Sequence, residues 1–106
     1  MDKKTLRALK ASIRKWERNA KVKYPDKYLV DSDDCPLCGL FFDLDCEGCP
    51  VMQRTGRRGC GDTPYIEASR ARVDWEWDYG PMEAAHDAAR KEVAFLKSLL
   101  PAEEAS

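Results

Sequence analysis

The chain has 106 residues, of which 43% are hydrophobic and 35% charged, and this length and balance predict one soluble globular domain. Residues 1–28 hold ten Lys or Arg against three acidic residues, so the net charge of −1 combines a +7 segment with a −8 remainder. The lack of a long apolar run argues against a signal peptide or membrane span, and the single histidine, His86, excludes paired-histidine metal motifs.

The first predicted element is an amphipathic helix from Thr5 to about Lys23, which ends before Pro25 because the residue preceding a proline avoids helical angles. Its apolar residues recur every three or four positions and share one stripe: Leu6, Leu9, Ile13, Trp16 and Ala20. Its basic residues are expected on the other faces: Lys3, Lys4, Arg7, Lys10, Arg14, Lys15, Arg18, Lys21 and Lys23. The sequence therefore predicts a helix that packs along one side and presents positive charge elsewhere.

A cysteine-rich segment, residues 35–62, follows with two Cys-x2-Cys pairs and a fifth cysteine: Cys35, Cys38, Cys46, Cys49 and Cys60. Disulfides do not persist in a reducing cytoplasm, and five thiols cannot all pair within one chain. Four thiolates at this spacing are typical of a closed structural Zn2+ site, which we favour over an iron–sulfur cluster. One cysteine is then spare, and the candidates are Cys46 and Cys60.

Two features are expected to shape this segment. A run of apolar residues is predicted to cover the metal as a turn or short irregular hairpin: Leu40, Phe41, Phe42 and Leu44. Pro50 suits the first position of a helix and Gly56 suits its end, so a helix of one or two turns is predicted to start at Cys49.

Residues 63–101 are predicted to form two helices separated by Gly80–Pro81. The first begins at Thr63–Pro64 and runs to about Tyr79, and the apolar residues expected on its core face are Ile66, Val73 and Trp77. The second runs from Pro81 to Leu100, and its apolar residues again share one stripe: Met82, Ala85, Ala89, Val93, Leu96 and Leu100.

The predicted fold class is all-α, in one domain of residues 1–106. The N- and C-terminal amphipathic helices have similar lengths and similar apolar stripes, so we expect them to pack together, antiparallel. The cysteine-rich segment is then an inserted metal-binding lobe between the basic helix of residues 1–28 and the two-helix segment of residues 63–101.

Two groups of surface residues are candidates for contacts with a macromolecule. Basic residues of the first helix and of the cysteine-rich segment could contact phosphates: Lys3, Lys10, Arg14, Arg54, Arg57 and Arg58. A solvated helix face is the equally favoured alternative for this charge. Trp75 and Tyr79 alternate with acidic residues that repel nucleic acid, which favours a protein interface, whereas Trp77 fits the core stripe. His86 is interpreted as a flanking residue of the last helix.

Several short runs, spread over most of the chain, form a recognisable pattern: Leu9-x-Ala-Ser-Ile13-x-x-Trp16, Cys35-Pro-Leu-Cys38, Cys46-Glu-Gly-Cys49-Pro-Val, Gly59-Cys60, Thr63-Pro64-Tyr65 and Glu92-Val-x-Phe95-Leu-x-Ser-Leu99-Leu100-Pro101. In these runs the chain resembles small cysteine-rich, zinc-finger-like proteins of unknown function encoded by tailed bacteriophages and prophages. The resemblance implies an origin and metal binding, and it carries over no catalytic residue.

The sequence therefore favours a non-enzymatic phage or prophage accessory protein, with structural zinc, that binds a host or phage protein in the cytoplasm of a bacterium. The first alternative is a zinc-finger-like regulator that binds DNA or RNA. A thiol redox protein or small metalloenzyme is a third class, which requires a reactive cysteine or an open metal position. A homodimer is compatible with each of these hypotheses.

Overall fold

The computed structural model describes residues 1–30, 36–41, 48–56 and 63–101. All regular elements in these ranges are helical, which confirms the predicted all-α class. The elements are α1 (Lys3–Asn19), the 3-10 turn η1 (Pro25–Lys27), α2 (Pro36–Phe41), α3 (Pro50–Thr55), α4 (Tyr65–Glu76) and α5 (Met82–Lys97). None of the helices among the described residues combines the length and the apolarity that crossing a bilayer requires.

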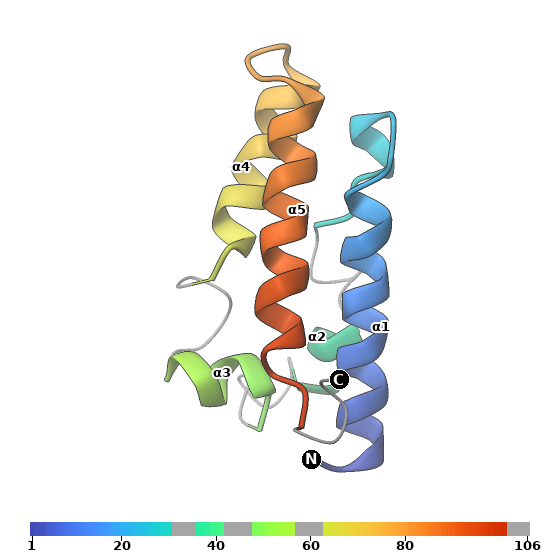
Figure 1. Ribbon diagram of the computed structural model, residues 1–106, viewed down its shortest axis with the longest axis vertical. Coiled ribbons are helices and arrows are strands. Elements are labelled where there is room, and N and C mark those ends of the chain that lie inside the picture. The colour runs from blue at the N-terminus through green and yellow to red at the C-terminus, as the bar shows by residue number, and fades with distance from the viewer. Residues whose placement is uncertain (31–35, 42–47, 57–62, 102–106) are drawn as a thin grey trace.

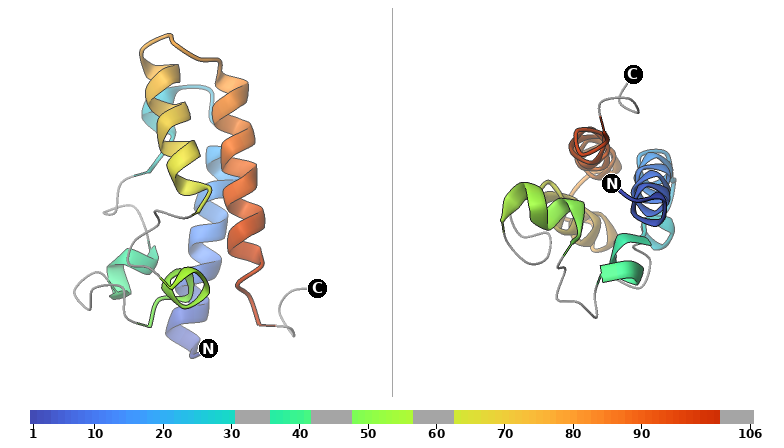
Figure 2. Two further views of the ribbon diagram at one scale, coloured as in Figure 1. Left: turned by 90° about the vertical axis from the view of Figure 1, so that its left-hand side faces the viewer. Right: turned by 90° about the horizontal axis from the view of Figure 1, so that it is seen from below.

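The three long helices form a bundle with α5 in contact with both others. α1 and α5 pack side by side and run in opposite directions, as expected for the terminal helices, and α4 packs on α5 as the other arm of a hairpin (Figure 1). α2 and α3 lie across the end of the bundle where the chain begins (Figure 2). The opposite end is formed by η1 and the turn between α4 and α5.

Helix α1 has the N-terminal cap and the buried apolar stripe that stabilise an amphipathic helix. The Asp2 carboxylate accepts a hydrogen bond from the Thr5 backbone N–H at 2.7 Å, which caps the helix and lowers the pKa of Asp2. Leu9, Ile13 and Trp16 are buried, so the predicted apolar stripe is confirmed at these positions. The helix ends at Asn19 rather than near Lys23.

Asn19 instead joins α1 to the extended segment after η1. Its side-chain amide donates to the Leu29 carbonyl oxygen at 2.9 Å, and its side-chain oxygen accepts from the Leu29 N–H at 3.0 Å. Asn19 is almost fully buried. The two bonds satisfy both polar groups of an inward-facing amide and fix the direction in which the chain returns along the bundle.

A group of aromatic rings fills the space between η1 and the long helices. The Tyr28 ring meets Trp16 and Trp75 edge to face, with centroids 5.8 Å and 6.4 Å apart, and Trp16 also meets Tyr65 at 6.2 Å. The Tyr28 hydroxyl donates to the Ala85 carbonyl oxygen of α5 at 2.8 Å. Rings in this arrangement contribute roughly 1 kcal/mol per pair beyond their buried area, so this group fixes where α4 and α5 lie relative to α1.

The cysteine-rich segment differs from the predicted lobe. The helix predicted after Cys49 is confirmed, with Pro50 at its first position and Gly56 at its end in the left-handed conformation, φ 74°. The turn or hairpin expected around Leu40 and Phe41 is wrong for these two residues, which lie in helix α2; proline at the start of that helix is compatible with helical φ. Phe42 and Leu44 lie outside the described residues.

The described part of this segment also shares the core of the bundle. α2 packs against α1, and Leu37, Cys49 and Val51 are buried in the same apolar cluster as the long helices. The described residues of this segment therefore do not form a separate lobe with its own apolar cover. Leu37 and Val51 carry enough apolar area to be drawn into the common core.

The orientation predicted for α4 is wrong. Ala68 is fully buried, whereas Val73 is 47% exposed and Trp77, just after the helix, is 67% exposed. Each helical residue advances by about 100°, so Ile66, Val73 and Trp77 lie about half a turn away from Ala68. The buried side of α4 carries small residues, and so does the side of α5 that it packs against, where Ala85, Ala88 and Ala89 are buried. Small side chains on both helices allow them to pack closely.

Candidate functional site

The cysteine module can be placed only in part. Cys38 lies in α2, and Cys49, which is 8% exposed, precedes the first residue of α3. Cys35, Cys46 and Cys60 lie outside the described residues. Among the residues that are described, no three or more His, Cys, Asp or Glu side chains form a group able to hold a metal ion. The predicted ligand set therefore stays a prediction.

The local backbone is compatible with thiolate ligands at these positions. A Cβ placed on Gly48, whose φ is 88°, would lie 3.3 Å from the Phe41 ring, so the turn before Cys49 lies against the helix that carries Cys38. Thiolates at Cys38 and Cys49 would come from adjoining elements. Cys49 at a helix N-terminus is also a position where the backbone dipoles favour the thiolate.

Among the described residues, the outer side of α4 and the turn after it carry the largest group of exposed apolar and aromatic side chains. We define the α4 surface as Ile66, Arg70, Val73 and Asp74 of the helix together with Trp77 and Tyr79 just beyond its end. Trp77 and Tyr79 are 67% and 84% exposed, and Ile66 and Val73 are also exposed. Exposed aromatic residues close together are characteristic of protein interfaces rather than of ordinary surface.

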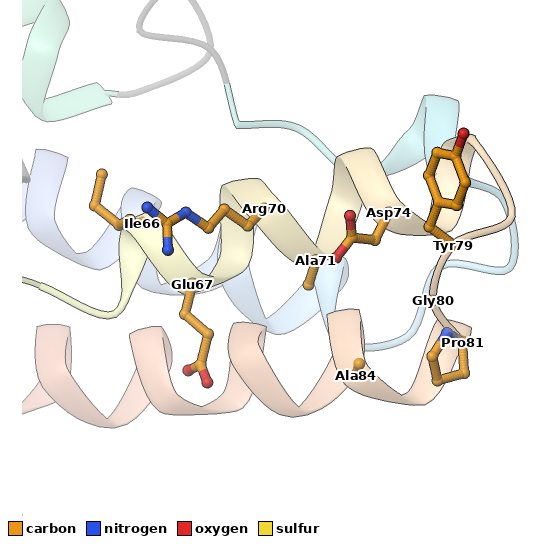
Figure 3. A pocket seen from close by; sticks show the side chains of 9 residues that line it. All are labelled: Ile66, Glu67, Arg70, Ala71, Asp74, Tyr79, Gly80, Pro81 and Ala84. Carbon is orange, nitrogen blue, oxygen red and sulfur yellow. The ribbon is translucent and has the colours of Figure 1, made fainter.

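A groove of about 480 Å³ runs beside the α4 surface, between α4 and α5. Ile66 lies at one end and Tyr79 at the other, with Arg70 and Asp74 between them (Figure 3). Its floor is lined by small side chains such as Ala71 and Ala84. Glu67 reaches from α4 toward α5 and forms an exposed ion pair with Lys91 at 3.1 Å.

Trp75 and Trp77 show the opposite of the expected burial: Trp77 was expected in the core and Trp75 at an interface. Trp75 is partly buried against the core, with ring contacts to Tyr28 and His86, and Trp77 is exposed. Tyr79, the other expected interface residue, is exposed as predicted. The two alanines of α4 could have predicted which side is buried, because small residues three apart lie on one face of a helix and allow another helix to pack closely against it.

The turn that carries Trp77 and Tyr79 has a fixed backbone. Asp78 adopts a positive φ of 61°, and the Tyr79 and Gly80 N–H groups both donate to the Asp74 carbonyl oxygen, at 2.7 Å and 3.1 Å. A Cβ at Gly80 would lie 3.1 Å from the Asp74 Cβ, so the close approach favours glycine. The two exposed aromatic residues are therefore held by a closed turn.

His86 lies on α5 beside this region and serves the fold. One ring nitrogen, Nε2, lies 2.7 Å from the Val22 carbonyl oxygen, and the ring meets that of Trp75 at 6.1 Å. These contacts agree with its interpretation as a flanking residue of the last helix. They tie α5 to the chain that follows α1.

Charged side chains are buried where α1 meets α5. Lys15, expected on a solvent face, is 4% exposed, with its Nζ 5.1 Å from the centre of the Trp16 ring, and Glu92 of α5 is 3% exposed. Burial raises the pKa of Glu92 to about 7, against the opposing charge of Lys15. Within the described chain, Glu92 Oε2 and Ser12 Oγ have no hydrogen-bond partner.

The expected phosphate contacts are dispersed. Lys3 and Arg14 are exposed on α1, Lys10 is half-buried, and Arg57 and Arg58 lie outside the described residues. Arg54 of α3 is used within the fold, because its guanidinium donates to the Ser98 carbonyl oxygen at 2.9 Å and to the Ser98 hydroxyl at 3.2 Å.

No protein-family model, curated protein or solved structure matches the chain.

Proposed function

We propose that this protein acts by binding another protein through the α4 surface, as a phage or prophage accessory protein directed at a host or phage partner. The observation that carries the proposal is the exposure of Ile66 and Val73 on α4 and of Trp77 and Tyr79 just beyond its end, while the other side of the helix is fixed in the core. Aromatic anchors on a rigid element bind partners with little loss of conformational entropy. The phage origin rests on the sequence resemblance alone.

Affinity capture from a bacterial lysate tests the proposal. The bait is the wild-type chain, the Trp77→Ser variant or the Tyr24→Ser variant, and bound proteins are identified by mass spectrometry and then titrated in purified form. Tyr24 is 65% exposed and stands just before η1, outside the residues that define the α4 surface, which makes it an aromatic control. We expect loss of Trp77 to weaken partner binding at least tenfold, as for an interface anchor. Equal binding by all three baits contradicts the assigned surface.

We further propose that four of the five cysteines hold one structural zinc ion that joins α2 and α3 to the bundle. The adjoining positions of Cys38 and Cys49 support this proposal, and zinc would supply cross-linking rather than chemistry. In such small modules bound zinc contributes roughly 10 kcal/mol or more. Metal content and unfolding of the Cys38→Ser variant test it: we expect loss of zinc and of α2 packing, and a variant with unchanged metal and melting curve contradicts it.

The exposed basic side of α1 supports one alternative, a regulator that binds DNA or RNA. Arg7, Arg14 and Arg18 are exposed, and none of them forms an ion pair within the described part of the chain. Phosphate binding would fall steeply with salt. Retention on duplex DNA at low salt that is lost in an Arg57→Glu, Arg58→Glu variant favours this alternative, and no retention excludes it.

A further inference from the structure

We infer that the α4 surface binds a second copy of this chain, with the two α4 helices antiparallel across a two-fold axis. The inference rests on the proposed function and deepens it, because it names the protein that occupies the surface when the purified chain is alone.

The spacing along the α4 surface is that of a seam between two packed helices. Ile66, Arg70, Val73 and Trp77 follow one another at intervals of four, three and four residues, the pattern by which one helix meets another along its length. All four are exposed. The opposite side of α4, at Ala68, is already buried in the core, so the seam is available only to a partner.

The charges on this seam are complementary to themselves. Arg70 lies in the middle of α4 and Asp74 one turn further, near its C-terminal end; both are exposed and form no ion pair within the described part of the chain. An antiparallel two-fold arrangement places Arg70 opposite the partner's Asp74, and Asp74 opposite the partner's Arg70. Each unpaired charge then meets one of opposite sign, twice in the same interface.

The apolar ends of the seam are complementary in the same arrangement. Antiparallel packing about the same axis sets Ile66 against the partner's Trp77, at the end of the groove that Ile66 lines. Ala71 and Ala84 line the groove farther along, toward Asp74 and Pro81 (Figure 3). A different protein would have to supply an acidic group opposite Arg70 and a cation opposite Asp74, whereas this chain already carries both in the required order.

Sedimentation velocity from about 1 µM to about 1 mM, the range in which small interfaces dissociate, measures the association. We expect the 12.1 kDa chain to shift to a dimer with increasing concentration. Arg70→Asp and Asp74→Arg should each weaken the dimer roughly tenfold or more, because each creates two like-charge contacts across the two-fold axis. Arg14→Asp on α1 is the charge-change control, and circular dichroism confirms folding of every variant.

A mixture of the two single variants decides the geometry. The Arg70→Asp chain carries two acids at these positions and the Asp74→Arg chain two cations, so mixing them should restore association as a heterodimer. The double variant, with both charges exchanged, should also dimerise. A mixture that stays monomeric, or single variants that dimerise like the wild type, overturns the inference. A wild-type chain that is monomeric throughout overturns it too, whereas Trp77-dependent capture of another protein would still support the proposed function.

Discussion

The buried carboxyl group of Glu92 makes stability depend on pH in a direction opposite to that of most acidic residues. Burial raises its pKa from an ordinary value of 4.5 to about 7, so the folded state holds the proton more tightly than the unfolded state. The stability carried by the protonated group is complete below pH 4.5 and is lost as pH rises through 7. At about 1.4 kcal/mol for each tenfold change in acidity, the loss is about 3 kcal/mol.

The Glu92→Gln variant isolates this contribution, since the amide has nearly the same size and no charge at any pH in the range. Near pH 4.5 the variant and the wild type should have equal free energies of unfolding, within about 1 kcal/mol. At pH 8 the variant should be more stable by about 2–3 kcal/mol, because it no longer buries an ionised group. Urea unfolding followed by tryptophan fluorescence measures both values.

The nearby charge of Lys15 provides a physical reason why the Glu92→Gln variant could instead be less stable than the wild type. If the main stabilisation came from attraction between the Lys15 ammonium and the Glu92 carboxylate, the glutamine variant would lose that attraction and would be less stable at pH 8. That outcome, or the same pH dependence in both proteins, would refute the reasoning. Glu83→Gln, an exposed change on the same helix, is the control and should leave the stability difference between pH 4.5 and pH 8 unchanged.

Two further predictions test the packing of the bundle. Asn19→Ala removes both hydrogen bonds between the buried Asn19 amide and the Leu29 backbone, whose groups are partly buried, so we expect a loss of about 2 kcal/mol in the free energy of unfolding by urea. Ala68→Leu should overpack the contact between α4 and α5 and cost about 1–3 kcal/mol, whereas Val73→Leu on the outer side should change stability by less than about 0.5 kcal/mol. If Ala68→Leu and Val73→Leu changed the stability equally, the burial of the Ala68 side of α4 would be contradicted.

The elements that the sequence predicted well are those with one clear local cause. The α1 stripe through Leu9, Ile13 and Trp16 is apolar on one side only, so its burial followed from periodicity. The bounds of α3 followed from Pro50 and Gly56, because a proline at the start and a left-handed glycine at the end act within a few residues.

The features that the sequence did not predict depend on contacts between distant segments. Both sides of α4 carry apolar residues, so periodicity alone could not choose between the alanine side and the side with Val73 and Trp77. Lys15 and Glu92 were unpredictable as buried residues, because charged side chains are normally solvated and only the meeting of α1 with α5 encloses them. The cysteine pattern indicates a metal site. Which four of the five thiols are the ligands depends on where each cysteine lies in the fold, which the spacing does not determine.

Trp77 points outward just beyond the end of α4, while Trp16 and Trp75 lie in the core. Hydroxyl-radical footprinting of the dilute wild-type protein, read by mass spectrometry on each tryptophan, tests this most directly. We predict that Trp77 is oxidised fastest, Trp75 more slowly and Trp16 slowest, and that only Trp77 becomes protected as the protein concentration rises. Fast oxidation of Trp75 with a protected Trp77 in dilute solution would contradict this placement of the two side chains.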